Sequence, residues 1–184
     1  AIAAIHNVKM ACYKIVPSTR WAIDFDSIRK KINKKTRGII LISPHNPTGA
    51  VATPEEIAQL SAIADRHGLP IISDEVFAPF LFTRKRLPRP PPSGLVFTLN
   101  GISKMLALPG CKIGWIGVSG DPERVQKSLR RLRGISDTHL PVNELMQFAL
   151  PRLLDEGKSF VEEYRSELFR RSKKGGVVPW GPSH

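Results

Sequence analysis

The chain has 184 residues, enough for one domain with a sizeable core, since a domain averages about 150 residues. Its composition, 41% hydrophobic and 24% charged, is globular and excludes a disordered chain, a collagen-like repeat and a disulfide scaffold. The net charge of +12 raises nucleic acid or anionic lipid as partners. A nucleic-acid-binding domain is disfavoured, because aromatic residues make up only 7% and the basic residues are scattered over several predicted helices.

The cysteine content, the first residues and the longest uncharged stretch indicate the cellular compartment. Cys12 and Cys111 are too few for a disulfide framework or a cysteine-rich metal site, which favours a reducing cytoplasm. The segment 1–5 has neither the basic region of a signal peptide nor an initiator Met, so we expect a cytoplasmic fragment. The longest uncharged stretch, residues 38–54, is interrupted by prolines and is shorter than the ~20 apolar residues of a membrane span. No contact with a membrane is expected.

The first predicted elements are a strand and a helix. Residues 8–16 mix β-branched and aromatic side chains and end at a Pro-Ser-Thr turn, a pattern typical of a strand. Asp24 or Asp26 then caps a helix that places Ile28 and Ile32 on one face.

A strand–helix–strand unit follows. Residues 38–43 form a short continuous apolar run, which indicates a buried strand, and a turn-rich stretch succeeds it. Thr53, Pro54 and Glu56 form a capping box that starts a helix, which Gly68 closes. Residues 69–73 repeat the buried-strand pattern, so the two strands are expected to pair in parallel.

The second half is predicted to alternate in the same way. Residues 84–94 are basic and proline-rich and are expected to form a surface loop. The remaining predicted elements are strands over 95–99 and 112–118 and helices over 121–133, 141–155 and 158–171. These elements predict an α/β fold with a mostly parallel sheet.

Polar side chains follow three of the predicted strands. Asn46, Asp74 and Lys104 come after the strands that begin near residues 38, 69 and 95, at intervals of 28 and 30 residues. Ligands of open α/β sheets bind beyond the carboxyl ends of the strands. An amide, a carboxylate and a lysine at one such edge suit pyridoxal phosphate, which forms a Schiff base with a lysine and pairs its ring nitrogen with an acid.

Three motifs in this order resemble the class I and II aminotransferases, which are fold type I pyridoxal phosphate enzymes. The motifs are Asn-Pro-Thr-Gly at 46–49, Asp-Glu-Val-Phe at 74–77 and Ser-Lys-x-x-x-x-Pro-Gly-x-Lys-x-Gly-Trp at 103–115. The resemblance covers about residues 1–170 and implies part of a three-layer large domain, with a mostly parallel sheet and helices on both faces. Residues 171–184 look like an irregular tail, from a truncation or a frameshift. The resemblance also implies a homodimer.

The resemblance implies a role for each strand-end residue. Lys104 is expected to hold the cofactor as a Schiff base and then to move the proton between the substrate Cα and the cofactor. Asp74 is expected to keep the pyridine nitrogen protonated, and Asn46 to donate its amide to the phenolic oxygen.

Further positions are expected to bind the cofactor but depart from the family pattern. Lys112 stands where relatives usually have an arginine that holds the phosphate, and it lacks the bidentate fork. Ser103 offers one hydroxyl to the phosphate, but Gly101 stands where many relatives carry a second. Phe77 replaces a tyrosine whose hydroxyl helps to hold the phenolic oxygen, and a phenyl ring cannot donate.

The expected function is transfer of an amino group between an amino acid and a 2-oxo acid. The glycine-rich phosphate loop, the ring-stacking aromatic and the carboxylate-binding arginine of the family are not found, so the chain is expected to be an enzyme fragment that is inactive alone. Two alternatives stay open: a fold type I lyase or decarboxylase, and a non-catalytic aminotransferase-like domain of a transcription regulator. His45, His67 and His139 lack ligand spacing, and no metal is expected.

Overall fold

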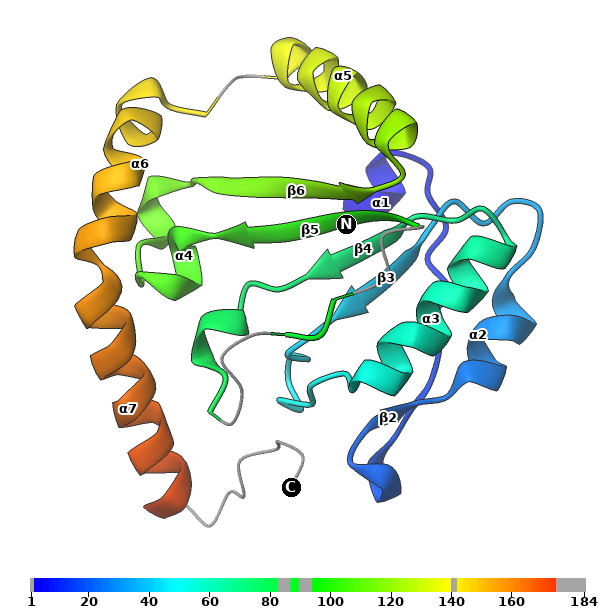
Figure 1. Ribbon diagram of the computed structural model, residues 1–184, viewed down its shortest axis with the longest axis horizontal. Coiled ribbons are helices and arrows are strands. Elements are labelled where there is room, and N and C mark those ends of the chain that lie inside the picture. The colour runs from blue at the N-terminus through cyan, green and yellow to red at the C-terminus, as the bar shows by residue number, and fades with distance from the viewer. Residues whose placement is uncertain (1, 83–86, 90–93, 140–141, 175–184) are drawn as a thin grey trace.

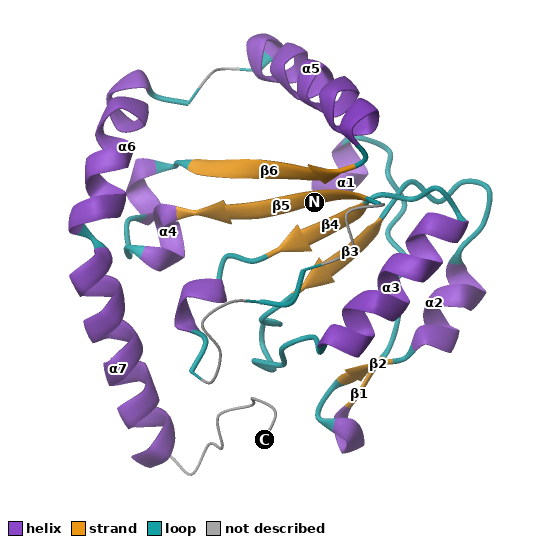
Figure 2. Ribbon diagram, viewed as in Figure 1, coloured by secondary structure: helices purple, strands orange, loops and turns teal. Residues whose placement is uncertain are grey.

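A four-stranded mixed sheet organises the molecule (Figure 1 and Figure 2). The computed structural model describes residues 2–82, 87–89, 94–139 and 142–174. The strands are β1 (Ile15–Val16), β2 (Ala22–Ile23), β3 (Ile39–Ile42), β4 (Ile71–Asp74), β5 (Leu95–Gly101) and β6 (Gly114–Gly120). The α-helices are α1 (Ile2–Ile5), α2 (Phe25–Lys31), α3 (Pro54–Arg66), α4 (Ile102–Met105), α5 (Pro122–Thr138), α6 (Glu144–Glu156) and α7 (Lys158–Lys174). Three short 3-10 helices are η1 (Pro17–Thr19), η2 (Ala78–Phe80) and η3 (Pro109–Cys111).

The order of the sheet is β3-β4-β5-β6, and its first three strands are parallel. Helix α3 makes the crossover between β3 and β4, as the strand–helix–strand pattern predicted. The predicted α/β fold with a mostly parallel sheet is thereby confirmed. Strand β6 pairs antiparallel with β5, because α4 and η3 turn the chain back at the carboxyl end of β5. The small hairpin of β1 and β2 forms a separate antiparallel pair.

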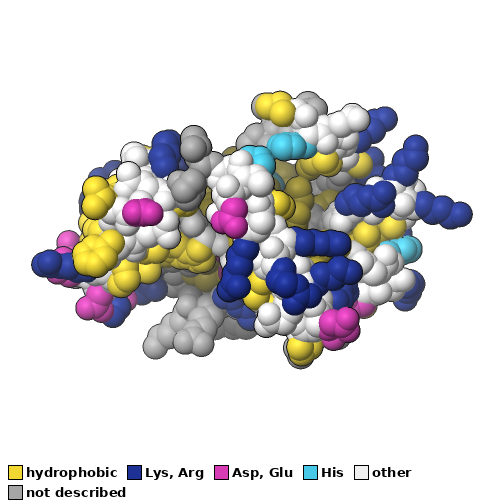
Figure 3. All heavy atoms as spheres, turned by 90° about the horizontal axis from the view of Figure 1, so that it is seen from above, with side chains coloured by type: hydrophobic (Ala, Val, Ile, Leu, Met, Phe, Trp, Pro, Cys, Tyr) yellow, Lys and Arg dark blue, Asp and Glu magenta, His cyan; other side chains and the backbone are white. Residues whose placement is uncertain are grey.

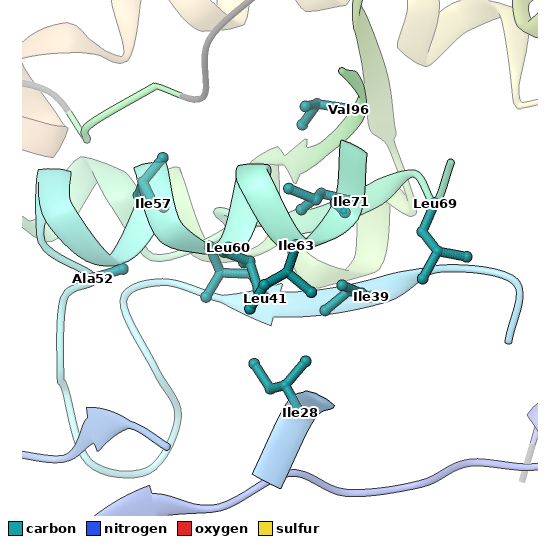
Figure 4. Packing of buried hydrophobic residues seen from close by; sticks show 11 residues of the cluster. Ile28, Ile39, Leu41, Ala52, Ile57, Leu60, Ile63, Leu69, Ile71 and Val96 are labelled. Carbon is teal, nitrogen blue, oxygen red and sulfur yellow. The ribbon is translucent and has the colours of Figure 1, made fainter. Parts of the chain in front are cut away.

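Helices α2 and α3 cover one face of the sheet. The core beneath them takes alternate residues of the parallel strands, as the pleat of a strand requires, together with the inner side of α3 (Figure 4). Leu60 of α3 is completely buried. The predicted capping box is confirmed: Thr53 Oγ1 accepts from Glu56 N–H at 3.2 Å, and Glu56 Oε2 accepts from Thr53 N–H at 2.9 Å.

The opposite face of the sheet is less covered. Ile40 and Ile116, which point to this face, are 36% and 46% exposed, and Ile72 and Phe97 are half-buried. A second apolar cluster lies beyond the carboxyl end of β5, where Ile102, Leu106 and Ile113 pack against α6 and α7. Helices α6 and α7 therefore sit beside the edge of the sheet at which the candidate site was predicted (Figure 1).

Some elements differ from the sequence-based prediction. Only Ile15 and Val16 of the strand predicted over 8–16 are paired in a strand, and residues 8–12 are exposed, with Val8 at 51% and Met10 at 58%. Helix α5 continues past Gly134 to Thr138, since a single glycine is tolerated inside a helix. The short helices α1 and α4 were not predicted.

The proposed division of the chain at residue 170 stays a prediction. Helix α7 runs on to Lys174, and residues 175–184 lie outside the described residues. Most of the predicted loop over 84–94 also lies outside them; residues 87–89 are described and have no regular structure.

Candidate active site

The carboxyl ends of the three parallel strands lie at one edge of the sheet, where β3 and β4 finish level and β5 runs two residues further, to Gly101. Ile42 is paired with Asp74, and Asp74 with Leu99. Backbone hydrogen bonds continue this register by one residue, from Ser43 N–H to Asp74 C=O and from Glu75 N–H to Leu99 C=O, both at 3.0 Å. Because neighbouring strands lie about 4.8 Å apart, Ile42, Asp74 and Leu99 lie within roughly 10 Å of one another, and β5 continues for two more residues before α4 begins.

Asp74 is the last residue of β4 and its side chain is half-buried. One carboxylate oxygen, Oδ1, accepts a hydrogen bond from Val76 N–H at 3.2 Å. This bond holds the carboxylate at the turn after the strand. None of the described residues donates a hydrogen bond to the second oxygen, which leaves it free to accept from a cationic or N–H donor of a ligand.

Asn46 lies in the loop that follows β3. The loop is closed by backbone hydrogen bonds from Gly49 N–H to His45 C=O at 2.7 Å and from His45 N–H to Ala50 C=O at 2.8 Å. His45 Nδ1 also lies 2.9 Å from Thr48 Oγ1. The Asn46 side chain is exposed at the tip of this closed loop.

Lys104 lies in α4, which begins directly after β5. Its side chain is exposed, and Ser103 beside it is half-buried. In the part of the chain that the structure describes, no hydrogen bond or ion pair joins Lys104, Asn46 and Asp74. The fold gathers the three residues at one edge of the sheet without a hydrogen bond or ion pair between them.

Lys112 is brought near Ser103 by a backbone contact between their neighbours. Ile102 N–H donates to Ile113 C=O at 3.4 Å, which places the start of α4 beside the end of η3. Lys112 itself is exposed and has a left-handed backbone with φ of 51°. Such a conformation is costly for a residue with a Cβ, so the backbone here is strained.

The structure explains the missing hydroxyl at position 101. A Cβ on Gly101 would lie 2.8 Å from Ile113 O and 3.0 Å from Gly114 Cα. Both contacts are with backbone, which cannot move aside cheaply. Any larger residue at this position would push β5 and β6 apart.

Phe77 lies after β4 at the start of η2 and is half-buried. The adjoining Phe80 packs edge-on against Tyr164 of α7, with ring centroids 5.3 Å apart. Phe82 packs against Phe169 with ring centroids 5.3 Å apart and the rings tilted by 50° to each other. Helix α7 therefore holds the segment after β4, including Phe77, against the carboxyl edge of the sheet.

Glu75 and Arg89 were not recognised in the sequence as part of this edge. Glu75 is 5% exposed, and its Oε1 accepts from Ser73 Oγ at 3.0 Å and from Arg89 Nη1 at 3.1 Å. The Arg89 guanidinium thus neutralises a buried carboxylate beside Asp74. In the sequence, an acidic residue directly after a predicted strand and a basic loop further on could have indicated this pair.

Asn100 was also missed. Its side-chain amide donates from Nδ2 to Glu75 C=O at 3.2 Å and accepts at Oδ1 from Gly101 N–H at 2.8 Å. In the sequence, the position of an asparagine at a strand end, four residues before Lys104, could have indicated its role. It joins the end of β4 to the start of α4.

A cavity of about 350 Å³ lies away from these residues, between the β1–β2 hairpin and the loop after β3. None of the predicted site residues lines it. Its acid and phenol are engaged within the protein: Glu56 accepts from Ile23 N–H at 2.8 Å, and Tyr13 OH donates to Ile40 C=O at 2.9 Å. Burial, and secondly the Glu56 charge, raises the pKa of Tyr13 above its usual value. The cavity therefore offers few polar groups to a ligand.

The basic surface also lies elsewhere. Figure 3 shows Lys and Arg side chains gathered over α5, where Lys127, Arg130, Arg131 and Arg133 are exposed. Helix α5 starts at the opposite edge of the sheet, where Arg124 Nη2 donates to Gly68 C=O at 3.3 Å. None of the helices in the described ranges is long and apolar enough to cross a membrane. Among the described residues, no group of three or more His, Cys, Asp and Glu side chains is arranged to hold a metal ion.

Named relatives of the chain are aminotransferases. Glutamate-pyruvate aminotransferase AlaA of Escherichia coli (strain K12) is 31% identical over 165 residues, covering 88% of this chain and 41% of that protein. Tyrosine aminotransferase of Dictyostelium discoideum is 28% identical over 170 residues, covering 88% of this chain and 40% of that protein. The chain thus spans about two fifths of the length of the curated relatives it matches.

Solved structures lead to the same family. The alanine aminotransferase from Pyrococcus furiosus superposes with a TM-score of 0.82 at 26% identity, over 94% of this chain and 44% of that chain. An Escherichia coli aminotransferase gives 0.69 at 31% identity, over 80% and 38%. The family model for aminotransferase class I and II matches residues 1–174. The chain therefore belongs to the class I and II aminotransferase family.

Proposed function

We propose that this chain is the cofactor-binding core of a pyridoxal phosphate-dependent aminotransferase, which moves an amino group between an amino acid and a 2-oxo acid. The observation that carries the proposal is that β3, β4 and β5 run parallel and end at one edge of the sheet, where Asp74 closes β4 and where Asn46 and Lys104 lie in the segments that follow β3 and β5. The names of the relatives support transamination in particular, since they act as aminotransferases.

The residues at this edge fit pyridoxal phosphate by their chemistry. A pyridinium N–H needs a carboxylate, a phenolic oxygen needs a donor, an aldehyde needs a primary amine and a phosphate needs cations and hydroxyls. Asp74, Asn46, Lys104 and the pair of Ser103 and Lys112 supply these groups in that order. Each has at least one polar atom that no other part of the described protein uses.

When bound, pyridoxal phosphate supplies an electron sink for the negative charge that develops on the substrate Cα. Asp74 supports this by holding a proton at the ring nitrogen, and the hydrogen bond from Val76 keeps its carboxylate in place. Lys104 provides the amine that attaches the cofactor, and then accepts and returns the α proton. Asn46 donates to the phenolic oxygen.

Ser103 and Lys112 bind the phosphate in this proposal. Lys112 contributes a point charge without the two parallel N–H donors of an arginine, and Gly101 contributes no hydroxyl. The cradle formed by this chain is therefore weaker than one with an arginine and two hydroxyls. Phe77 fills the space beside the ring without donating a hydrogen bond.

The extent of the chain limits what it does alone. Because it covers 41% of a curated relative, the groups that orient the substrate carboxylate are expected from other polypeptide, either further sequence or a second subunit. We expect the isolated 184-residue chain to bind pyridoxal phosphate weakly and to show no transaminase activity. We also propose a cytoplasmic homodimer, consistent with two cysteines that are both free thiols.

The proposal is tested by assaying amino transfer in the longest natural polypeptide that contains these 184 residues. Pairs of amino acids and 2-oxo acids, beginning with glutamate and pyruvate, are supplied together with pyridoxal phosphate. Lys104→Ala should abolish transfer, and Lys127→Ala, on exposed α5, should leave it at the parental rate. Release of CO₂ or ammonia without a new amino acid would instead establish a decarboxylase or lyase.

A further inference from the structure

Asn100 makes two hydrogen bonds that reach the two chain segments of the proposed site. Its Nδ2 donates to the carbonyl of Glu75, the residue that follows Asp74, at 3.2 Å. Its Oδ1 accepts from the N–H of Gly101, the residue at the N-cap of α4, at 2.8 Å. Lys104 is the third residue of that helix. One side chain thus joins the segment of Asp74 to the segment of Lys104.

The two bonds fix the orientation of the Asn100 amide. A flipped amide would set its oxygen against the Glu75 carbonyl and its NH₂ group against the Gly101 N–H, so both bonds would be lost. Only a side chain that carries a donor and an acceptor side by side makes both contacts. Aspartate keeps the acceptor alone, and alanine has neither group.

The residue that Asn100 holds is itself well anchored. Glu75 N–H donates to Leu99 C=O at 3.0 Å, and Ala78 N–H donates to Glu75 C=O at 2.9 Å. Glu75 is 5% exposed, and its carboxylate is bound by Ser73 and Arg89. The position of Glu75 therefore follows that of β4, and a displacement of Asn100 would change the distance between this strand and α4.

The backbone at Gly101 and Ile102, which leads into α4, is also tightly held. Gly101 packs so closely against Ile113 and Gly114 that a Cβ would collide with their backbone. Ile102 N–H donates to Ile113 C=O at 3.4 Å. Helix α4 has only four residues, and so short a helix is not stable by itself. The contacts at Gly101 and Ile102 therefore determine the position of α4 and of Lys104 within it.

We propose that Asn100 is a positioning residue that sets the placement of Lys104 relative to Asp74. The proposal rests on the proposed function, because the distance between an amine and a carboxylate matters only if both act on one bound molecule. A misplacement of about 1 Å can lower a rate about 100-fold. Asn100 acts through the backbone of Glu75 and Gly101 and does not itself touch the cofactor.

The test uses the longest natural polypeptide that contains this chain, loaded with pyridoxal phosphate, in the forms Asn100→Asp, Asn100→Ala and the parent. Asn143→Asp is the matched control, because Asn143 only caps α6 by accepting from Met146 N–H. Two readouts are taken: kcat with KM for the amino acid, and the pH midpoint of the absorbance change of the bound cofactor. Borohydride reduction and peptide mapping identify the labelled lysine in every form.

The expected result is a graded loss. Asn100→Asp should lower kcat about 10-fold and Asn100→Ala about 100-fold, with KM changed less than about 3-fold. The pH midpoint should move by about 0.5 unit or more in both, because the distance from the Asp74 charge changes. Asn143→Asp should keep the parental kcat and midpoint.

Several results would overturn the inference. If the parent and both variants are labelled at Lys104 and share the same kcat and pH midpoint, Asn100 has no positioning role although the proposed function stands. A parent that is not labelled at Lys104 overturns both proposals. If neither variant folds, NMR of the parent decides: the Nδ2 protons of Asn100 should exchange with water more slowly than those of exposed Asn143, and equal rates would contradict the inference.

Discussion

The face of the sheet under α2 and α3 and the carboxyl edge of the same strands are built in opposite ways. Under the helices, the core residues are at most 8% exposed and every one packs against others (Figure 4). At the edge, Asn46 and Lys104 are exposed, and the side chain of neither has a hydrogen-bond partner among the described residues. The two regions share the strands β3, β4 and β5.

This contrast separates two kinds of residue. Core side chains pack against other apolar side chains, so replacing them changes the free energy of unfolding. At the carboxyl edge, Asn46, Asp74 and Lys104 have polar side-chain atoms without a partner among the described residues, so replacing these residues should change ligand binding and rate while leaving stability nearly unchanged. Four predictions test whether the division holds.

The largest effect is expected in the core. Leu60→Ala should lower the free energy of unfolding by about 2–5 kcal/mol, because Leu60 is completely buried and the surroundings cannot close the cavity fully. Urea unfolding followed by circular dichroism measures this change. Leu145→Ala is the control, since Leu145 is 74% exposed and its loss should cost less than about 0.5 kcal/mol. Equal losses for the two variants would mean that α3 does not cover a closed core.

The next effect is expected at the edge. Asp74→Asn keeps an oxygen that accepts from Val76 N–H but removes the negative charge. It should lower kcat about 100-fold in the longest natural polypeptide while the urea midpoint hardly moves. Asp24→Asn, at the N-cap of α2, is the matched control and should leave kcat unchanged. A parental rate in Asp74→Asn would show that this carboxylate is only a turn cap.

Phe77→Tyr should produce a smaller change in the same region. The added hydroxyl could donate to the phenolic oxygen of bound pyridoxal phosphate and stabilise its deprotonated form, which should lower the pH midpoint of the cofactor absorbance by about 1 unit. Phe80→Tyr serves as control, because Phe80 packs against Tyr164 of α7. An unchanged midpoint in Phe77→Tyr would place this ring away from the cofactor.

The smallest effect is expected on the exposed surface of α7. Hydrogen bonds from Arg170 and Arg171 hold the pKa of Glu167 at about 2, below its ordinary 4.5. A lowered pKa means that the stabilisation is present at neutral pH and is lost as the pH falls from about 4.5 through about 2. Glu167→Gln should therefore be slightly less stable than the parent at pH 7, and the difference should disappear as the pH falls below about 2. Parallel pH profiles of the two would contradict this ion pair.

The sequence allowed most of the core region to be predicted. The apolar runs before Ser43 and Asp74 and the capping box at Thr53 led to strands and a helix that the structure confirms. Local sequence patterns are enough to predict these elements, because a few consecutive residues indicate a buried strand or a helix cap. The strand predicted over 8–16 was wrong for most of its length, since residues 8–14 pair with no partner strand and residues 8–12 are exposed.

The carboxyl edge could be predicted only in part. Asn46, Asp74 and Lys104 were found from their place after strands, and the structure does bring them to one edge. The contacts of Asn100 and of the Glu75–Arg89 pair were not foreseen, because they join residues 25 and 14 positions apart through side chains. The antiparallel direction of β6 also depends on α4, which is too short to show a helical period.

The most direct test of the account is to find where the cofactor attaches. The longest natural polypeptide that contains this chain is incubated with pyridoxal phosphate, reduced with borohydride, digested and mapped by mass spectrometry. We expect the reduced adduct on Lys104 in the parent and in a Lys112→Ala variant, and its loss in Lys104→Ala. An adduct on another lysine, or bound cofactor with no adduct in the parent, would contradict the assignment of this edge as the cofactor site.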